Sequence, residues 1–474
     1  VRMGPQIGAT SLLLILIDPA IVFDIGAWLS FLAVGALGWV TELRTAPESR
    51  PLPPDEVTWY DRIREWWHFL LQNAEMSYRQ MLAVTLLSAP VVATQFHVVS
   101  LVGMVINILL IPFTTLTLIA GYLLVFIGLL IPPMAFVPAA IFDVCLSVLN
   151  GAVSVSADLP YGFVTLPDLP GWFLPVYYGL LGLSAIAVRS VVQQSLRLLL
   201  LLLVMLTFWN ADTSPRPGEL VCTTLSVGHG NAIVVETPGG RVLLFDAGAL
   251  NRAERTADIV CRFLWHRGYR MLDAIVISHP DADHYNAVQS LLDRMPVGQV
   301  MLTTEFARAE SPEVQAVVSA MADSRIPVSV VMHDDHFELE DCRFNFFKAS
   351  PQPESEMSDN SSSLVCFVTY QGRRICLPGD LEGDGQQQLL SSLPECDLLV
   401  SPHHGSPASN TAGFSQTLAP TDVFVSARDH ERRVQLEQIF PRAAIHFTSE
   451  VGALMYRISE NGQANVQAFR TKIR

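Results

Sequence analysis

A series of apolar segments fills the first part of the chain, roughly residues 1–210. Half of all residues are hydrophobic and only 16% are charged, and the apolar excess lies in this part. A helix that crosses a bilayer needs about 20 mostly apolar residues, because lipid offers its backbone no hydrogen-bond partner. We therefore expect an all-α, polytopic membrane bundle over residues 1–211. Its apolar segments lie near residues 11–17, 21–40, 81–93, 97–112, 114–134, 136–155, 172–188 and 196–209.

Polar residues interrupt this membrane part at a few places. Asp18 and Asp24 divide the first apolar stretch, which predicts one broken helix or a pair, with the carboxylates either facing a polar cavity or lying in an interfacial loop. Asn107 stands five residues before Pro112, and lipid alone does not favour such a side chain at that depth. Asn107 is thus a candidate channel residue, although similar features occur in membrane proteins that conduct nothing.

One short loop sets the expected orientation. Residues 189–197, RSVVQQSLR, carry Arg189 and Arg197 and no acidic residue. The positive-inside rule puts such a loop in the cytoplasm, so the last span would deliver everything after it to the outer face.

A linker rich in helix breakers, DTSPRPG at residues 212–218, precedes a second domain that we assign to residues 219–474. Here short apolar runs alternate with amphipathic stretches, which predicts two sheets with helices outside them. Strands are expected near 220–227, 232–236, 241–245, 273–277, 298–303, 328–332, 343–348, 363–369, 373–377, 397–401 and 422–426, and helices near 256–267, 287–294, 312–323 and 386–392.

Residues that can bind a metal ion follow several of these strands. The stretch VISHPDADH at residues 276–284 leaves an apolar run with two histidines and two aspartates within six positions. Imidazole and carboxylate groups suit Zn²⁺ or Mn²⁺, and packing them so closely is costly unless a cation neutralises them. Asp246, Asp380 and the pair His403 and His404 also end apolar runs. The alternative interpretation of 276–284 is an exposed, solvated acidic turn.

The order of motifs resembles that of metallo-β-lactamase-fold domains, in the version carried by the ComEC family of competence channels. The motifs are VGHGNA at 227–232, FDAG at 245–248, HPDADH at 279–284, NSSSLV at 360–365, LPGD at 377–380 and HHGS at 403–406. The stretches GAWLSFL at 26–32 and NILLIP at 107–112 resemble the membrane domain of the same family. Against this family, early membrane segments and a small soluble domain that precede residue 1 are expected to be missing.

The resemblance implies an αββα metallo-β-lactamase-like sandwich with one or two divalent ions, Mn²⁺ or Zn²⁺, with Mg²⁺ as a further option. His279 and Asp281 would serve one metal position, and Asp283 and His284 the other. Asp380 would bridge them and His403 would complete the ligand set.

Further roles follow from the same resemblance. Asp283 would serve catalysis as well as metal binding, and His404 or Asp246 would orient ligands or handle a proton. Substrate or solvent would be bound by hydrogen-bonding residues of two motifs, namely Asn360, Ser361, Ser362 and Ser406.

The sequence also departs from a lactamase-type site. Such a site would have a histidine at position 281 and another near 360, where this chain has Asp281 and Asn360. The first metal position is therefore poorer in nitrogen ligands, which favours oxygen-preferring Mn²⁺ or Mg²⁺, or a single occupied position. The tripeptide YNA at residues 285–287 and Val400 also replace residues that many relatives have.

The charge of the chain bears on DNA binding. The net charge is −15, and most of the acidic excess lies in the second domain, whereas affinity for phosphate usually requires a basic surface. The residues Arg428, Arg432, Arg433 and Arg442 form a local basic cluster, which is either a solvated helix face or a groove.

The family resemblance implies a multi-pass protein of the bacterial inner membrane that takes up single-stranded transforming DNA. A metal-dependent nuclease domain on the outer face would degrade the strand that is not transported. Its expected partners are DNA, the lipid membrane, a DNA receptor and a cytoplasmic helicase or single-strand binder, and the chain can form an oligomer. Two alternatives remain open at this point, namely a catalytically degenerate domain that guides the strand and a membrane-tethered hydrolase of a small ester or lactam.

Overall fold

In the computed structural model, residues 3–42, 59–157, 159, 162–209, 218–350 and 358–469 are described. They belong to two compact units, Val1–Asn210 and Ala211–Arg474, which are considered separately below. The linker expected at residues 212–218 lies, except for Gly218, outside the described residues.

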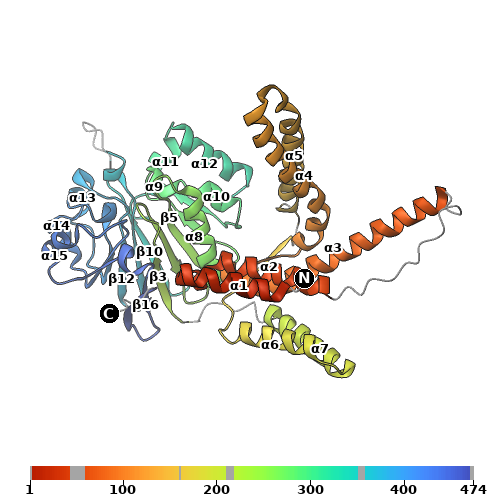
Figure 1. Cartoon of the computed structure of the whole chain (residues 1–474). Coiled ribbons are helices and arrows are strands. Elements are labelled where there is room, and N and C mark those ends of the chain that lie inside the picture. The colour runs from red at the N-terminus through yellow and green to blue at the C-terminus, as the bar shows by residue number, and fades with distance from the viewer. Residues whose placement is uncertain are drawn as a thin grey trace. The chain divides into compact units, whose positions relative to one another are not determined.

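The first unit is built of helices (Figure 1). Its helices are α1 (Met3–Ile17), α2 (Ile25–Glu42), α3 (Trp59–Phe96), α4 (Gly103–Leu130), α5 (Phe136–Ala157), α6 (Phe173–Ile186) and α7 (Ser190–Trp209), with short 3₁₀ turns η1 (Pro19–Phe23) and η3 (Pro132–Met134). Within the described residues, three helices are long and apolar enough to cross a membrane, at Leu109–Leu130, Pro132–Ser156 and Ser190–Thr207. The expected helical membrane part is therefore confirmed as a fold class.

Two details of this unit differ from the prediction. The apolar segments expected at 97–112 and 114–134 are joined by one continuous helix, α4, which covers Gly103–Leu130 and keeps Pro112 in its interior. The bundle also contains a small antiparallel ribbon, β1 (Val98–Ser100) with β2 (Phe163–Thr165). These strands pair because the chain leaves the helices there, and its backbone N–H and C=O groups need partners.

Asp18 and Asp24 act as caps rather than as buried charges. Oδ1 of Asp18 accepts a hydrogen bond from the backbone N–H of Ala20 at 2.9 Å, and Oδ1 of Asp24 accepts one from Ala27 at 2.8 Å. Both satisfy N–H groups at the start of a helical turn, which have no partner within the helix. Asn107 lies on α4 with its side chain exposed.

The second unit contains two mixed sheets. The first sheet has the order β17-β16-β3-β4-β5-β6-β7-β8, and the second has the order β15-β14-β13-β12-β11-β10-β9. The strands of the first sheet are β3 (Leu220–Thr224), β4 (Ala232–Glu236), β5 (Val242–Ala247), β6 (Ala274–Val276), β7 (Val300–Leu302), β8 (Val328–Val330), β16 (Leu454–Ile458) and β17 (Ala464–Ala468). Those of the second are β9 (His336–Leu339), β10 (Cys342–Phe347), β11 (Val365–Tyr370), β12 (Arg373–Leu377), β13 (Leu398–Val400), β14 (Asp422–Val425) and β15 (Ala444–Phe447).

Alternation along each strand sends its side chains to two different cores. In β5, Leu243 and Phe245 join the core between the sheets, whereas Val242 and Leu244 join a core on the outer face. Residues from the second sheet, such as Phe424, fill the same inner layer. Since successive strand residues point to opposite faces, a strand that is apolar at every position must be covered on both sides.

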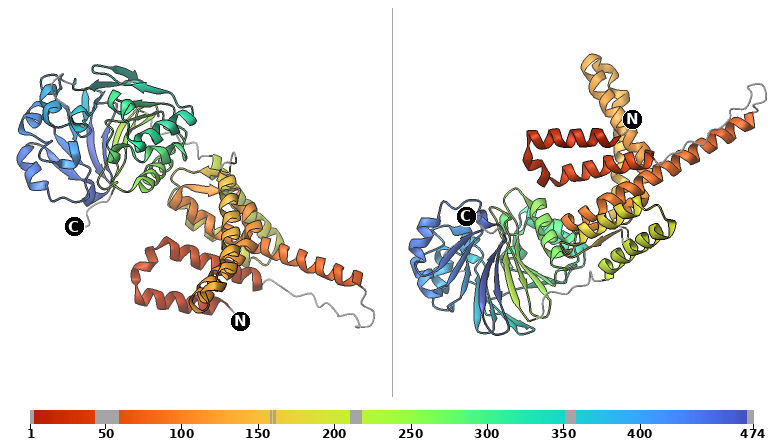
Figure 2. Two further views of the ribbon diagram at one scale, coloured as in Figure 1. Left: turned by 90° about the horizontal axis from the view of Figure 1, so that it is seen from above. Right: turned by 60° about the horizontal axis from the view of Figure 1, so that its bottom comes forward.

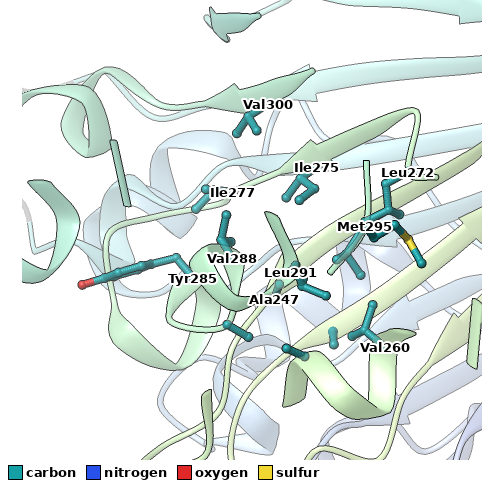
Figure 3. Packing of buried hydrophobic residues seen from close by; sticks show 14 of the residues in the cluster. Ala247, Val260, Leu272, Ile275, Ile277, Tyr285, Val288, Leu291, Met295 and Val300 are labelled. Atoms are coloured by element: carbon teal, nitrogen blue, oxygen red, sulfur yellow. The ribbon is translucent and has the colours of Figure 1, made fainter. Parts of the chain in front are cut away.

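Helices supply those outer covers, as the two views in Figure 2 show. The first sheet is covered by α8 (Ala253–His266), α10 (Val288–Leu292) and α12 (Pro312–Asp323), whose buried residues belong to one core cluster with the sheet. Figure 3 shows part of this packing, with Val260 of α8 and Val288 and Leu291 of α10. The second sheet is covered by α13 (Gly383–Leu389), α14 (Ala412–Leu418) and α15 (Arg433–Ile439). The expected αββα sandwich is confirmed. Strands β9 and β15–β17 and helices α14 and α15 were not predicted from the sequence.

Candidate metal centre

The ends of parallel strands bring the polar residues of the second unit together. Strands β5 and β6 are parallel neighbours in one sheet, and β12 and β13 are parallel neighbours in the other. Asp246 is the second-to-last residue of β5, and His279 to His284 follow β6. Asp380 follows β12 and His404 follows β13. The carboxyl ends of parallel strands meet at one edge of a sheet, so these loops converge there.

Two glycines let the ligand-bearing loops approach one another closely. A Cβ atom on Gly248 would lie 2.5 Å from the backbone carbonyl carbon of Asp283, and one on Gly230 would lie 2.3 Å from the carbonyl oxygen of Gly248. The loops are joined there by backbone hydrogen bonds, from Asn231 to Asp283 at 3.1 Å and from Gly248 to Asn231 at 2.9 Å. The glycines of the VGHGNA and FDAG motifs are therefore needed for loop contact.

The first group of candidate ligands is fully buried. One ligand atom each of His279, His284 and Asp380 lies within 4.8 Å of the other two. Among the described residues, Nε2 of His279 has no hydrogen-bond partner. A buried polar atom without a partner is costly, and a divalent cation would satisfy it together with the neighbouring carboxylate. The donor set therefore fits a metal ion.

Asp246 fixes the orientation of His284. Its carboxylate accepts hydrogen bonds from the Ser278 N–H at 2.8 Å, from the Ser278 hydroxyl at 2.9 Å and from Nδ1 of His284 at 2.7 Å. With the Nδ1 proton held by Asp246, Nε2 of His284 presents a lone pair to Oδ1 of Asp380, 3.1 Å away. Two such acceptors need a proton or a cation between them. Asp246 belongs to neither group of candidate ligands, and it would orient His284 for a bound ion.

The second group combines His229, Asp283 and His404, whose ligand atoms again lie within 4.8 Å of one another. Nε2 of His404 is 3.1 Å from Oδ2 of Asp283, and Nε2 of His229 is 3.9 Å from the same oxygen. Nδ1 of His404 donates to the Ser426 carbonyl at 3.1 Å, which leaves Nε2 as the ligand atom.

Asp380 connects the two groups. Its Oδ1 faces His284 at 3.1 Å, and its Oδ2 lies 3.8 Å from Nε2 of His404. Its backbone N–H donates to the hydroxyl of Ser363 at 3.1 Å, which fixes the residue at the end of its loop. One carboxylate between two sets of ligands has the placement of a bridging ligand in a two-metal site.

The electrostatics keep these carboxylates ionised. Burial raises the pKa of Asp380, but the imidazoles of His284 and His404 more than offset this and hold it well below its ordinary value. Burial likewise opposes ionisation of Asp283, yet its hydrogen bond with His404 and the charge of His284 lower its pKa to about 2. The centre thus carries two anionic carboxylates among histidines, as a cation requires.

The pKa values of His284 and His229 are shifted in opposite directions. Burial lowers the pKa of His284, but the carboxylates of Asp380 and Asp246 outweigh it and raise that pKa well above the usual value. A proton is therefore held where the cation would lie. Burial and the neighbouring His404 lower the pKa of His229, which favours the neutral imidazole that can bind a metal.

The ligand set in the structure differs from the predicted one at His403. His403 and His404 both have left-handed backbone, with φ of 48° and 52°. This tight turn sends the His404 ring to Asp283 and the His403 ring to Glu382, whose Oε2 lies 2.9 Å from Nδ1 of His403. The backbone N–H of His403 donates to Asp380 at 3.1 Å, and the ring of His403 lies edge to face with that of His404, with 6.3 Å between the ring centroids. His404 occupies the place that was predicted for His403.

Asp281 and His229 are the other two differences. Asp281 lies outside both groups within the described ranges, with its side chain 43% exposed and its Oδ2 3.5 Å from Nε2 of His279. His229 was absent from the predicted set, although its motif, VGHGNA, carried the family resemblance. A histidine between two glycines directly before a strand was the signal that could have identified it.

The predicted substrate residues lie beside the centre. Nδ2 of Asn360 donates to Oε1 of Glu382 at 3.0 Å, and Oδ1 of Asn360 is buried without a hydrogen-bond partner in the described part of the chain. Ser361 bonds with Ser358, and the Ser362 hydroxyl donates to the carbonyl of Asp359. These serines therefore close their own turn.

Ser406 lies on the other side of the turn that carries the histidines. Its N–H donates to the His403 carbonyl at 2.8 Å, and its side chain is partly exposed. A role of Ser406 in substrate binding stays a prediction.

Comparisons with known families and proteins follow the division into two units. The family described as "Competence protein" matches residues 5–191, and the "Metallo-beta-lactamase superfamily" matches residues 225–426. ComE operon protein 3 of Bacillus subtilis is 26% identical over 82% of this chain and 53% of its own length. Competence protein ComA of Neisseria gonorrhoeae is 25% identical over 86% of this chain and 51% of its own length. The chain thus spans about half the length of these curated relatives.

Among solved structures, the metallo-beta-lactamase fold protein YhfI from Bacillus subtilis aligns with 52% of this chain and 100% of its own, at 11% identity and a TM-score of 0.36.

Proposed function

Because the chain joins a competence-protein domain to a metallo-beta-lactamase domain, we propose that it takes up single-stranded DNA through its membrane unit and hydrolyses phosphodiester bonds in its second unit. The observation that carries the hydrolase part is the pair of histidine–carboxylate groups that share Asp380. A bound pair of divalent ions would supply an activated water and stabilise charge on the attacking and leaving oxygens.

The residues of this chain would hold and orient that centre. His279, His284 and Asp380 form one position, and His229, Asp283 and His404 form the other, with Asp380 between them. Such a site suits a substrate with two oxygens to be stabilised at once, which a phosphodiester has.

His403 supports the proposal by its position beside the centre. Glu382 holds its Nδ1, and the hydroxyl of Ser409 donates to the same carboxylate at 2.9 Å. Nε2 of His403 is then the atom left to accept a proton or a hydrogen bond, and to donate one to a phosphate or a leaving oxygen once the ring is protonated.

The uptake part rests on the competence-protein match of the membrane unit. We propose an inner-membrane protein whose second unit lies on the outer face. Of the two arginines expected in a loop, Arg189 lies between α6 and α7, whereas Arg197 belongs to the first part of α7, so the predicted loop at residues 189–197 is largely helical. Both positive charges still lie at or near the start of the last span, which supports a cytoplasmic start. Asn107 on α4 is the proposed channel residue. DNA is the proposed substrate, and a DNA receptor and a cytoplasmic single-strand binder or helicase are the proposed partners.

The test compares two variants of the full chain in detergent micelles. Asp380→Asn removes the shared carboxylate, and Asp384→Asn removes an exposed carboxylate of α13 as the matched control. Metal content and cleavage of labelled single-stranded DNA with added Mn²⁺ or Zn²⁺ are measured for both.

We expect metal content and cleavage to be lost in Asp380→Asn and kept in Asp384→Asn. Full metal content without cleavage in the unaltered chain would favour the guiding domain instead. Hydrolysis of a small ester or lactam but of no DNA would favour the tethered hydrolase. Loss of transformation in a deletion strain, restored by the chain, tests the uptake part separately.

A further inference from the structure

A small polar cavity opens directly beside the second group of candidate ligands. It has a volume of about 110 Å³, and its walls include His229, His404, Arg428 and Arg432. Pockets for drug-sized ligands hold roughly 300–1,000 Å³, so this cavity is smaller than such a site and is suited to a small group such as a phosphate.

The cavity rests on the ligand loops themselves. The carbonyl of Ser426 accepts the hydrogen bond from Nδ1 of His404 at 3.1 Å, and the hydroxyl of Ser426 donates to the carbonyl of Gly230 at 2.7 Å. Gly230 directly follows His229, so one serine ties the loop with Arg428 to both histidines. The backbone that leads to Arg428 is therefore fixed relative to the two histidines.

The four clustered arginines differ in the contacts that they make. Arg433 is held by Glu450 at 2.7 Å, with its guanidinium 4.8 Å above the ring of Phe447, so it fastens α15 to the sheet. Arg428 and Arg432 have no ion-pair partner among the residues that the structure describes, and both are exposed. Guanidinium groups bind phosphate oxygens well because their planar fork matches them.

Two acidic residues also line the cavity. Asp429 and Glu431 are exposed, and Oδ1 of Asp429 accepts the N–H of Glu431 at 3.2 Å, which closes the turn between the arginines. With two cationic and two anionic groups, the wall offers no general attraction to polyanions. The cavity suits one phosphate that reaches both arginines at once.

We propose that this cavity binds a phosphate of the nucleic-acid strand that flanks the bond cleaved at the metal centre, with Arg428 and Arg432 as its ligands. The inference rests on the proposed function, because it identifies how that site holds its substrate. A strand with a phosphate beside the reacting one would therefore bind more tightly than a diester that has only the reacting phosphate.

The first test measures binding by the full chain in detergent, with a labelled phosphorothioate DNA strand that resists hydrolysis. Arg428→Ala and Arg432→Ala are each expected to weaken binding by about tenfold, because each loses a charge-assisted hydrogen bond. Arg442→Ala, the matched loss of an exposed arginine outside the cavity, is expected to change binding by less than about twofold. The double variant should lower the salt slope of log K by about 0.7, the loss of one phosphate contact on a single strand.

A neutral methylphosphonate linkage, placed at successive positions of the strand, locates the contact. At one position it should weaken binding to the unaltered chain and add nothing to the loss in the Arg428→Ala, Arg432→Ala double variant. Inorganic phosphate should compete with the strand more effectively in the unaltered chain than in the double variant, in which only the metal centre is left to bind it. Equal effects of every methylphosphonate in both proteins, or equal binding by all arginine variants, would overturn the proposal.

Hydrolysis of bis(4-nitrophenyl) phosphate separates this inference from the proposed function, because that diester has a single phosphate. Its turnover and the metal content should be the same in the arginine variants and the unaltered chain. Absence of turnover with every chain would refute the hydrolase, and the binding measurements would still decide whether the cavity holds a phosphate.

Discussion

Replacement of Asp246 by asparagine tests whether Asp246 fixes the tautomer of His284, and it changes no proposed metal ligand. Asp246 is fully buried, and its Oδ2 accepts from both the Ser278 hydroxyl and Nδ1 of His284. Oδ1 of an asparagine can still accept the N–H of Ser278, as Oδ1 of the aspartate does at 2.8 Å. Its NH₂ group would then replace Oδ2 and face the Nδ1 proton of His284.

Two donors cannot face each other, so His284 would move its proton to Nε2 and lose the lone pair that a metal needs. Groups that orient a metal ligand typically contribute about 10–100-fold to metal affinity. The hydrogen bond to a charged group that is lost is worth about 1.5–3 kcal/mol, which corresponds to a similar factor. We expect Asp246→Asn to weaken metal binding by about 10–100-fold.

Competition of the full chain in detergent against a fluorescent chelator measures this affinity for Zn²⁺ and Mn²⁺. Asp384→Asn is the control, because it removes a carboxylate from the surface of α13. A melting temperature close to that of the unaltered chain would show that the fold is retained. Unchanged affinity for both metals would refute the argument that Asp246 sets the tautomer of His284.

Three further predictions concern stability and topology. The Glu236 carboxylate is only 2% exposed, and its ion-pair partner is Arg267 at 2.8 Å. Arg267→Met leaves this carboxylate buried without its partner and should lower the free energy of unfolding by about 3 kcal/mol, as measured by chemical denaturation. Burial, only partly offset by Arg267, raises the pKa of Glu236, so protonation favours the folded state. The deficit of the variant should therefore shrink as the pH falls from 8 to 5, and a constant deficit would contradict this. Gly248→Ala should displace the loop of Asp283, lower the free energy of unfolding by about 1–3 kcal/mol, and reduce both the melting temperature and the metal content. Gly372→Ala, where a Cβ meets no atom within 4 Å, should keep its metal. A reporter that is active only outside the cytoplasm, fused at Arg474, should be active, and activity of a cytoplasmic reporter there would reverse the orientation.

Local pattern determined the larger divisions of this protein. Segment length and hydropathy separated a helical membrane part from a second part with strands, because a bilayer and water demand different side chains. Asp246, Asp380 and the histidines after β6 were found because polar residues that end apolar strands tend to share an edge. Short edge strands such as β9 and β17 were missed, because half-exposed runs lack a distinct apolar period.

Only the tertiary structure decided which candidate ligands lie together and which residues hold them in place. His403 and His404 are equivalent in sequence, and two left-handed backbone angles turn one toward Glu382 and the other toward Asp283. His229 comes from a loop more than 50 residues before Asp283, and a close contact at Gly248 brings the two together.

The sequence likewise could not distinguish the roles of neighbouring arginines. Arg432 and Arg433 are adjacent, yet one lines the cavity and the other is paired with Glu450. Residue types and their order along strands are local properties that a pattern records. The direction of each side chain depends on backbone angles and on contacts between distant loops, which are settled only when the two sheets pack together.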